Sequence, residues 1–278
     1  MSFIKTKSTH PNGDPIKLHY TDWGTGKVVI LIHGWPSSED MWEYQLNELP
    51  KAGLRCIAYT RRGFGKSCKP WGAYDYDTLA SDLNDVIETL GVSDVTLVGF
   101  SMGGGEVARY LKNYGSSKVS KVVLISSVLP FLAKSDDNPD GVPTSVFDTM
   151  MEGMKADRPG FLESFYKDFF GVGLLSHPVG EPFLAHSREI SAFSSGRATQ
   201  ECAAAFAYTD FRNDLAAITV PTLIIHGSSD KTVPIEASSD RTAKMLPHAQ
   251  YVVYDGAPHG LWFTEKDRLN ADLIAFAG

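Results

Sequence analysis

The sequence predicts an α/β fold in which a mostly parallel, doubly wound sheet carries a helical insertion. Continuous apolar runs recur along the 278 residues, and amphipathic segments separate them. Such runs are typical of strands covered on both faces, and strand–helix alternation favours parallel pairing. The runs are Val28–Ile32, Leu54–Tyr59, Val95–Phe100, Val119–Ile125 and Thr222–Ile225.

An antiparallel edge strand is expected before these runs. Residues 15–22 alternate apolar and polar side chains after the turn signal Asn12-Gly13, as a half-exposed strand does. Between the parallel strands, apolar residues three and four positions apart predict helices with one buried face. The clearest set is Leu79, Leu83, Val86, Ile87 and Leu90.

The strand–helix rhythm breaks between residues 128 and 215, which predicts a helical cap inserted into a single domain of residues 1–278. A turn-rich stretch at 136–141 precedes helical patterns around 146–155 and 161–170. Ten of the fifteen phenylalanines fall between Phe131 and Phe211. They suit either an apolar roof over a substrate pocket or simple packing between the helices, and the sequence leaves both open.

Composition and charge favour a small-molecule partner. The net charge is −7, and no basic cluster is longer than Arg61-Arg62, which argues against nucleic acid. Residues 1–10 lack the apolar stretch of a secretion signal, and no run approaches the ~20 apolar residues needed to cross a bilayer. We therefore expect a cytoplasmic protein without a membrane partner, and the sequence leaves a homo-oligomer open.

The three cysteines fit neither a disulfide framework nor a zinc site. Cys56, Cys68 and Cys202 are odd in number and widely spaced. We expect structural thiols and no metal.

Ser101 is the predicted nucleophile. Gly99-Phe-Ser-Met-Gly103 has the form G-x-S-x-G and joins the buried run Val95–Phe100 to a predicted helix over 102–113. A sharp strand-to-helix turn lifts the serine hydroxyl clear of the sheet, and flanking glycines avoid Cβ collisions there. Three successive glycines at a helix start cost about 1 kcal/mol each relative to alanine, which points to a steric or functional demand.

Two backbone amides are predicted oxyanion donors. The N–H of Met102 lies at the helix start, beside Ser101. A second donor should come from the loop after another central strand, and Trp35 follows the run Val28–Ile32. Such preorganised donors stabilise the transition state of acyl transfer.

A serine hydroxyl needs a base, and His259 is the best placed of the eight histidines. It lies in Gly256-Ala-Pro-His-Gly260, directly after a predicted strand at 249–255. Asp230 lies a few residues past the buried run Thr222–Ile225 and is the predicted acid. The remaining polar candidates near strand ends, His33, His226 and Asp214, are expected to have packing, structural or capping roles.

Seven segments carry motifs of one family: His33-Gly-Trp-Pro36, Met41-Trp-Glu-Tyr-Gln45, Arg61-Arg-Gly-Phe-Gly65, Tyr74-Asp-Tyr-Asp-Thr78, Gly99 to Tyr110, Asp136-Asp-Asn-Pro139 and Gly256-Ala-Pro-His-Gly260. Together they resemble the cofactor-free haloperoxidases and their relatives, the bacterial aryl esterases and γ-lactamases, among the α/β-hydrolases. The chain order serine, aspartate, histidine agrees with this fold.

The resemblance implies hydrolysis of small esters, or of cyclic amides, through an acyl-enzyme and without any cofactor. It also implies perhydrolysis, in which hydrogen peroxide replaces water and releases a peracid that oxidises halide. Pro36 is the residue found in haloperoxidase-like members, so we predict peracetic acid formation from acetate and peroxide.

One residue departs from the family pattern: Thr60 stands where an aspartate usually precedes the Arg-Arg-Gly-Phe-Gly segment. We expect no catalytic role for Thr60, and a charge at Arg61 or Arg62 that is less well compensated. Thr60 also breaks the phosphate-loop pattern that Gly63-Phe-Gly-Lys-Ser67 suggests.

Three alternatives to the esterase remain at this level. A dehalogenase or epoxide hydrolase needs an aspartate nucleophile where this chain has Ser101. A γ-lactamase would use the same residues on a cyclic amide. A ligand receptor on the same scaffold would bind without turnover.

Overall fold

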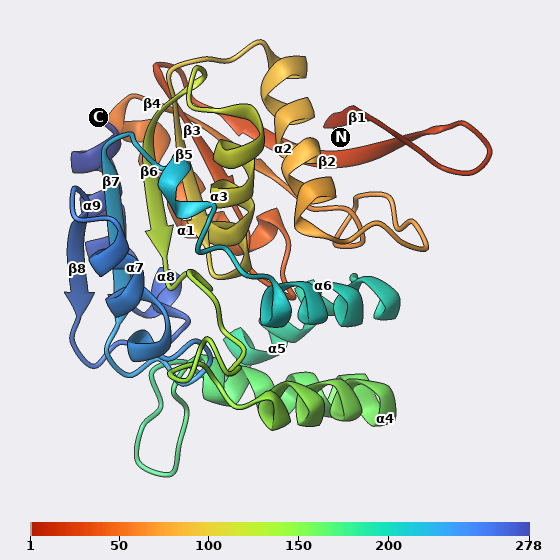
Figure 1. Ribbon diagram of the computed structural model, residues 1–278, viewed down its shortest axis with the longest axis vertical. Helices are drawn as coiled ribbons and strands as arrows, with labels where there is room; N and C mark the ends of the chain where they lie inside the picture. The colour runs from red at the N-terminus through yellow and green to blue at the C-terminus, as the bar shows by residue number, and fades with distance from the viewer. Residues whose placement is uncertain (1) are drawn as a thin grey trace.

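The computed structural model describes residues 2–278. Its eight strands are β1 (Ser2–Thr9), β2 (Pro15–Trp23), β3 (Lys27–Ile32), β4 (Leu54–Tyr59), β5 (Val95–Phe100), β6 (Val119–Ile125), β7 (Thr222–Gly227) and β8 (Gln250–Tyr254). They form one sheet in the order β1-β2-β4-β3-β5-β6-β7-β8 (Figure 1). The β1–β2 and β2–β4 pairs are antiparallel, and all the others are parallel. The predicted fold class is confirmed, and residues 15–22 lie in an antiparallel strand as expected, but the edge strand is β1 and not this one, because β2 pairs with β1 on one side and with β4 on the other.

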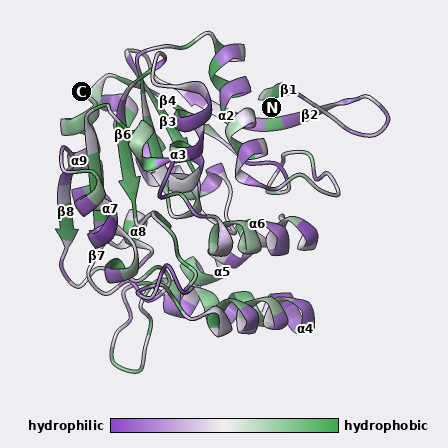
Figure 2. Cartoon of the chain, viewed as in Figure 1, coloured by the Kyte–Doolittle hydropathy of each residue, from purple (hydrophilic) through white to green (hydrophobic). Residues whose placement is uncertain are grey.

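The central strands are buried on both faces because alternate side chains enter two separate cores. Along β3, Ile30 and Ile32 belong to one hydrophobic cluster, whereas Val29 and Leu31 belong to the other. All four are at most 1% exposed. This two-sided burial explains the continuous apolar runs, which colour the central strands green in Figure 2.

Helices cover both faces of the sheet. They are α1 (Glu43–Glu48), α2 (Tyr76–Leu90), α3 (Met102–Tyr114), α7 (Ser239–Met245), α8 (Leu261–Thr264) and α9 (Lys266–Ala277). Helix α2 begins where the Asp75 carboxylate accepts from the Thr78 N–H at 2.9 Å, and it ends at Gly91 with φ +60°. Both are standard helix-capping devices, so the sequence itself sets the limits of α2.

Three further helices lie between β6 and β7 in the chain and stand apart from the sheet layers (Figure 1): α4 (Thr144–Phe169), α5 (Glu181–Ala192) and α6 (Gly196–Tyr208). The backbone of α4 breaks at Asp157 (φ −155°, ψ 90°), two residues before Pro159, because proline removes a helical hydrogen bond. The two helical patterns predicted at 146–155 and 161–170 are the two halves of α4.

The sequence patterns missed β1, α5 and α6. Strand β1 is an edge strand that buries few side chains, chiefly Ile4 and Thr6. None of the helices within residues 2–278 combines the length and apolarity that a bilayer-spanning segment needs.

Candidate active site

Ser101 lies on the sharp turn between β5 and α3, at φ 54° and ψ −118°. A positive φ is unusual for a residue with a side chain and costs conformational energy. Two neighbours hold the turn: the Ser101 N–H donates to the Ile125 carbonyl at 2.8 Å, and the Val128 N–H donates to the Ser101 carbonyl at 3.3 Å. The serine is 6% exposed.

The glycines around Ser101 are required by close backbone approach. A Cβ on Gly99 would lie 2.6 Å from the Gly103 carbonyl oxygen, and one on Gly103 would lie 2.7 Å from the Ile32 carbonyl oxygen. Neither position has room for a side chain. The steric demand for glycine that the sequence predicts therefore comes from backbone atoms of the turn and of β3.

The structure brings Ser101, His259 and Asp230 together from the carboxyl ends of β5, β8 and β7. His259 Nε2 lies 3.0 Å from Ser101 Oγ, and His259 Nδ1 lies 2.5 Å from Asp230 Oδ2. The carboxylate can only accept, so Nδ1 carries the proton and Nε2 is free to accept one from Ser101. His259 and Asp230 are 0% and 6% exposed.

Asp230 is held by four contacts. Its Oδ1 accepts from the N–H groups of Thr232 and Val233 at 2.9 and 2.8 Å. Its Oδ2 contacts His259 and, at 3.1 Å, Nε2 of His226. Burial raises the pKa of Asp230, but the charges and hydrogen bonds of the two histidines outweigh it and hold that pKa well below its usual range. The carboxylate therefore stays ionised beside His259.

The expectation that His226 has only a packing role is wrong. Its imidazole touches the acid at the end of β7, as described above. The spacing of four residues between His226 and Asp230 along a strand and its loop was the available signal. This signal is weak, because His226 lies inside an apolar run, where a packing role is the usual one.

The segment after β3 passes directly over the serine. A Cβ on Gly34 would lie 3.1 Å from Ser101 Cβ, so the backbone that leads into Trp35 lies close to Ser101. The Trp35–Pro36 peptide bond is cis, and Trp35 Nε1 donates to the Thr199 carbonyl at 2.9 Å. Met102 begins α3, where a helical N–H has no intrahelical acceptor. Met102 thus follows Ser101 directly in the chain, and Gly34, the residue before Trp35, lies against Ser101 in space.

A buried ion pair supports this segment. The Arg61 guanidinium lies 2.8 Å from Glu106 and donates to the His33 carbonyl at 2.9 Å. His33 Nε2 accepts from the Arg61 N–H at 3.0 Å, while Nδ1 lies 2.8 Å from the Gly34 carbonyl oxygen and donates to it. His33 therefore has the structural role expected of it, between the strand end and the loop.

The expectation of a poorly compensated charge near Thr60 is wrong. Arg61 pairs with Glu106, and Arg62 pairs with Asp82 at 2.6 Å. Thr60 is fully buried, and its Oγ1 accepts from the Glu39 N–H at 3.1 Å. Asp214, expected as a surface or capping group, is buried and pairs with Arg109 at 2.6 Å.

A cavity of about 920 Å³ opens on Ser101 and Trp35. Its walls come from α4, from Phe206 of α6 and from the segments that follow β6 and β7. This volume accommodates a small organic substrate.

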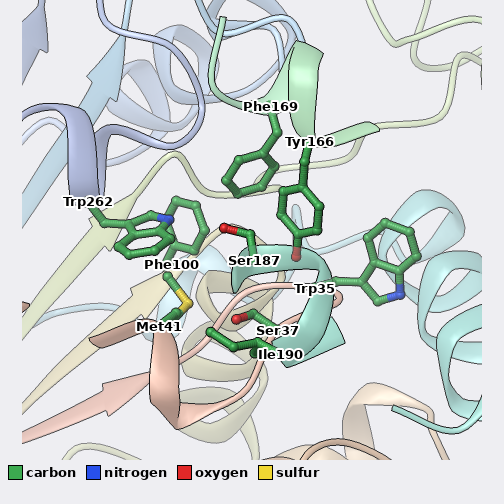
Figure 3. Close-up of a pocket in the computed structure, with 9 residues that line it drawn as sticks. All are labelled: Trp35, Ser37, Met41, Phe100, Tyr166, Phe169, Ser187, Ile190 and Trp262. Atoms are coloured by element: carbon green, nitrogen blue, oxygen red, sulfur yellow. The ribbon is translucent and has the colours of Figure 1, made fainter. Parts of the chain in front are cut away.

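A second, much smaller cavity of about 10 Å³ lies between the core and the helices α4 and α5 (Figure 3). Core and inserted helices meet there: Trp35, Ser37 and Met41 face Tyr166 and Phe169 of α4 and Ser187 and Ile190 of α5, with Phe100 and Trp262 beside them. It has room for about one water molecule. The Phe100 and Phe169 rings pack against the His259 ring, with centroids 5.0 and 4.8 Å away. No local pattern marks Phe169 as a neighbour of His259, because it lies at the end of α4, between β6 and β7 in the chain.

Within residues 2–278, no three His, Cys, Asp or Glu side chains gather in the arrangement that a metal ion needs.

Comparison with known proteins identifies the family. The model of the alpha/beta hydrolase fold family matches residues 27–266. A bromoperoxidase from Bacillus anthracis, a solved structure, is 46% identical with a TM-score of 0.94, over 99% of this chain and 98% of that one. The non-heme chloroperoxidase CPO-A1 of Kitasatospora aureofaciens is 40% identical over 95% of this chain and 96% of its own. The bifunctional esterase/perhydrolase DCH of Acinetobacter calcoaceticus is 37% identical over 99% of both chains. The chain belongs to the α/β-hydrolase family, in the group that includes non-heme haloperoxidases and esterases.

Proposed function

We propose that this enzyme is a serine hydrolase of small carboxylic esters that also catalyses perhydrolysis. The observation that carries the proposal is the relay Ser101–His259–Asp230, with contacts of 3.0 and 2.5 Å, beside a cavity of about 920 Å³. Relatives that are named haloperoxidases and an esterase/perhydrolase support it. The proposed substrate is a small molecule.

Acylation uses the described contacts. Ser101 Oγ attacks the ester carbonyl carbon while His259 Nε2 takes its proton, and Asp230 stabilises the imidazolium that forms. The N–H groups of Met102 and Trp35 donate to the oxyanion. Collapse of the intermediate breaks the ester bond, the alcohol leaves with the proton from His259, and the acyl group stays on Ser101.

Deacylation reverses these roles. Water loses a proton to His259 and attacks the acyl carbon, which releases the acid and restores the serine hydroxyl. When hydrogen peroxide attacks instead, the same bonds break and form, and the product is a peracid. The peracid then oxidises a halide ion to hypohalous acid and is itself reduced to the carboxylic acid. None of these steps requires a cofactor.

The insertion over residues 128–215 is proposed as the cap that shapes the substrate pocket. Helix α4 lines the large cavity, and its Phe169 packs on His259. The Gly260 N–H donates to the Phe169 carbonyl at 2.9 Å, which ties the cap to the histidine loop.

The test is a substrate panel of short esters, a bicyclic lactam, and acetate with hydrogen peroxide, run on the wild type and on Ser101→Ala. We expect ester hydrolysis by the wild type and loss of every activity in the variant, on the order of 10⁵-fold or more. A lactam that is hydrolysed faster than every ester would replace the esterase by the γ-lactamase alternative.

Ser164→Ala is the matched control. Ser164 lines the same cavity but makes none of the described contacts with His259. It should keep the wild-type activity within about twofold. Full activity in Ser101→Ala, or equal loss in both variants, would contradict the proposed mechanism.

A further inference from the structure

The cavity at Ser101 has two chemically different zones. Its buried wall is apolar and includes Val128, Leu132 and Phe147, which are 1%, 2% and 6% exposed. All the ionisable side chains that line it are exposed: Asp140, Asp157, Asp168, Lys231 and Glu236. A substrate therefore meets charge at the outer end and hydrocarbon further in.

The outer end is negative. Four carboxylates, those of Asp140, Asp157, Asp168 and Glu236, face one ammonium group, that of Lys231. We call the four carboxylates the acidic mouth. They come from both sides of the cavity, since two lie on α4 and Glu236 follows β7.

These charges are not neutralised within the described part of the chain. No ion pair found there includes any of the five side chains. Asp157 Oδ1 accepts from the Gly160 N–H at 3.1 Å, a hydrogen bond that leaves its charge in place. The whole chain adds to this field with a net charge of −7.

A negative cleft with apolar walls repels anions and concentrates cations, an effect that fades beyond about 10 Å at 0.1 M salt. A carboxylate substrate must pass this mouth and then lose water against a hydrocarbon wall. The lining offers it one cation, Lys231, and that side chain is exposed. A neutral ester is not repelled by the carboxylates and does not have to lose the water that surrounds a charge.

We propose that the acidic mouth selects uncharged and cationic esters over carboxylates, so that a neutral ester supplies the acyl group for perhydrolysis faster than a free carboxylate does. The inference rests on the esterase function proposed above. From an ester, Ser101 is acylated with loss of the alcohol. From a carboxylic acid, the same acyl-enzyme forms with loss of water, but the acid is an anion at neutral pH.

The first test compares acetate esters of similar shape: 3,3-dimethylbutyl acetate, 2-(trimethylammonio)ethyl acetate and 3-acetoxypropanoate. A second series of neutral, cationic and anionic esters carries these charges on the acyl group instead of on the alcohol. We expect kcat/KM for the cationic ester to exceed that for the anionic ester on the order of 10-fold or more in 10 mM salt. In 0.5 M salt the ratio should fall to about threefold or less.

The second test neutralises the mouth without changing side-chain shape. The variant combines Asp140→Asn, Asp157→Asn, Asp168→Asn and Glu236→Gln, and the asparagine at 157 keeps an acceptor for the Gly160 N–H. A control variant makes the same change in net charge at exposed positions that do not line the cavity: Asp14→Asn, Glu88→Gln, Asp94→Asn and Asp267→Asn. The mouth variant should bring the cation-to-anion ratio close to one, and the control should keep it.

Peracid formation gives an independent readout. With hydrogen peroxide, ethyl acetate should yield peracetic acid faster than acetate at equal concentration, and the mouth variant should raise the acetate-dependent rate about 10-fold. One result would overturn this inference but leave the proposed function intact. In it, the neutral ester is hydrolysed well, and the cationic and anionic esters of both series are hydrolysed within twofold of each other in 10 mM salt. No hydrolysis of the neutral ester would overturn the proposed function as well.

Discussion

His226 Nε2 lies 3.1 Å from Asp230 Oδ2, the same oxygen that contacts His259 Nδ1. The proton positions on His226 follow from its other contacts. Nε2 also lies 2.9 Å from the Val233 carbonyl oxygen, which can only accept, so Nε2 carries a proton. Nδ1 then accepts from Ser239 Oγ at 2.7 Å. The single Nε2–H therefore donates to the Val233 carbonyl and also faces Asp230 Oδ2 at 3.1 Å, so His226 helps to stabilise and orient this carboxylate.

Replacing His226 by asparagine should lower kcat about 10-fold or more, because hydrogen bonds to a charged group contribute about 1.5–3 kcal/mol. Asparagine keeps a polar atom near the Nδ1 position but does not reach Asp230. Glutamine reaches the Nε2 position and should restore most of the activity. Steady-state kinetics on a chromogenic ester, with thermal unfolding of each variant, separate this positioning role from simple destabilisation. Equal loss in both variants would argue against it.

Gly99→Ala should destabilise the protein by about 2 kcal/mol and lower activity by at least about 100-fold, because the new Cβ would meet the Gly103 carbonyl oxygen at 2.6 Å. Relief of this clash moves the turn that holds Ser101. Gly196→Ala is the control, since a Cβ there meets no atom within 4 Å. Urea unfolding and ester kinetics on both variants check the prediction, which a fully active Gly99→Ala enzyme would contradict.

Glu106→Gln should cost about 3 kcal/mol of unfolding free energy or more, because it leaves a buried guanidinium without its counter-charge. Arg61 and Glu106 are 1% and 0% exposed. Burial raises the pKa of Glu106 and lowers that of Arg61, so each charge depends on the other. The exposed pair of Lys51 and Glu48 is the control. Glu48→Gln should change stability by less than about 0.5 kcal/mol in the same urea titration.

Cys56 and Cys202 should resist iodoacetamide in the folded protein at pH 8. Burial raises the pKa of each thiol to about 12, so roughly one molecule in 10⁴ carries the reactive thiolate at that pH. Cys68 is partly exposed and should be modified first. Mass spectrometry of the native and urea-unfolded protein measures this order, and native labelling at Cys202 would show that its surroundings open.

The sheet and the three relay residues could be predicted because the signals for both lie in short stretches of the sequence. Each central strand is buried on two faces, so its apolar run marks its limits, and Ser101 and Asp230 each follow such a run. His259 follows the partly exposed edge strand β8, where the loop Gly256–Gly260 is the signal. Once parallel strands are assumed, their carboxyl ends meet at one edge of the sheet. That the three relay residues lie close together then follows without knowledge of any long-range contact.

The rest depends on contacts between distant segments. Phe169 touches His259, and Glu106 compensates Arg61, but neither pairing leaves a pattern in the neighbouring residues. The buried faces of helices α5 and α6 carry serine, threonine and alanine beside few large apolar side chains, so their apolar periodicity is weak. Strand β1 alternates in burial only at Ile4 and Thr6, and because Thr6 is polar the apolar pattern is too short to predict a strand.

The inserted helices leave the sheet after β6 and return before β7, whereas the relay residues sit on β-strand ends outside that interval, apart from the contacts of Phe169. Variation in 144–208 can therefore alter substrate range while the machinery for bond cleavage stays untouched. A mutant library confined to the exposed positions of this interval, and to its cavity-lining positions outside the two hydrophobic cores, should retain a high fraction of folded and active members, because the side chains that the interval shares with those cores stay unchanged.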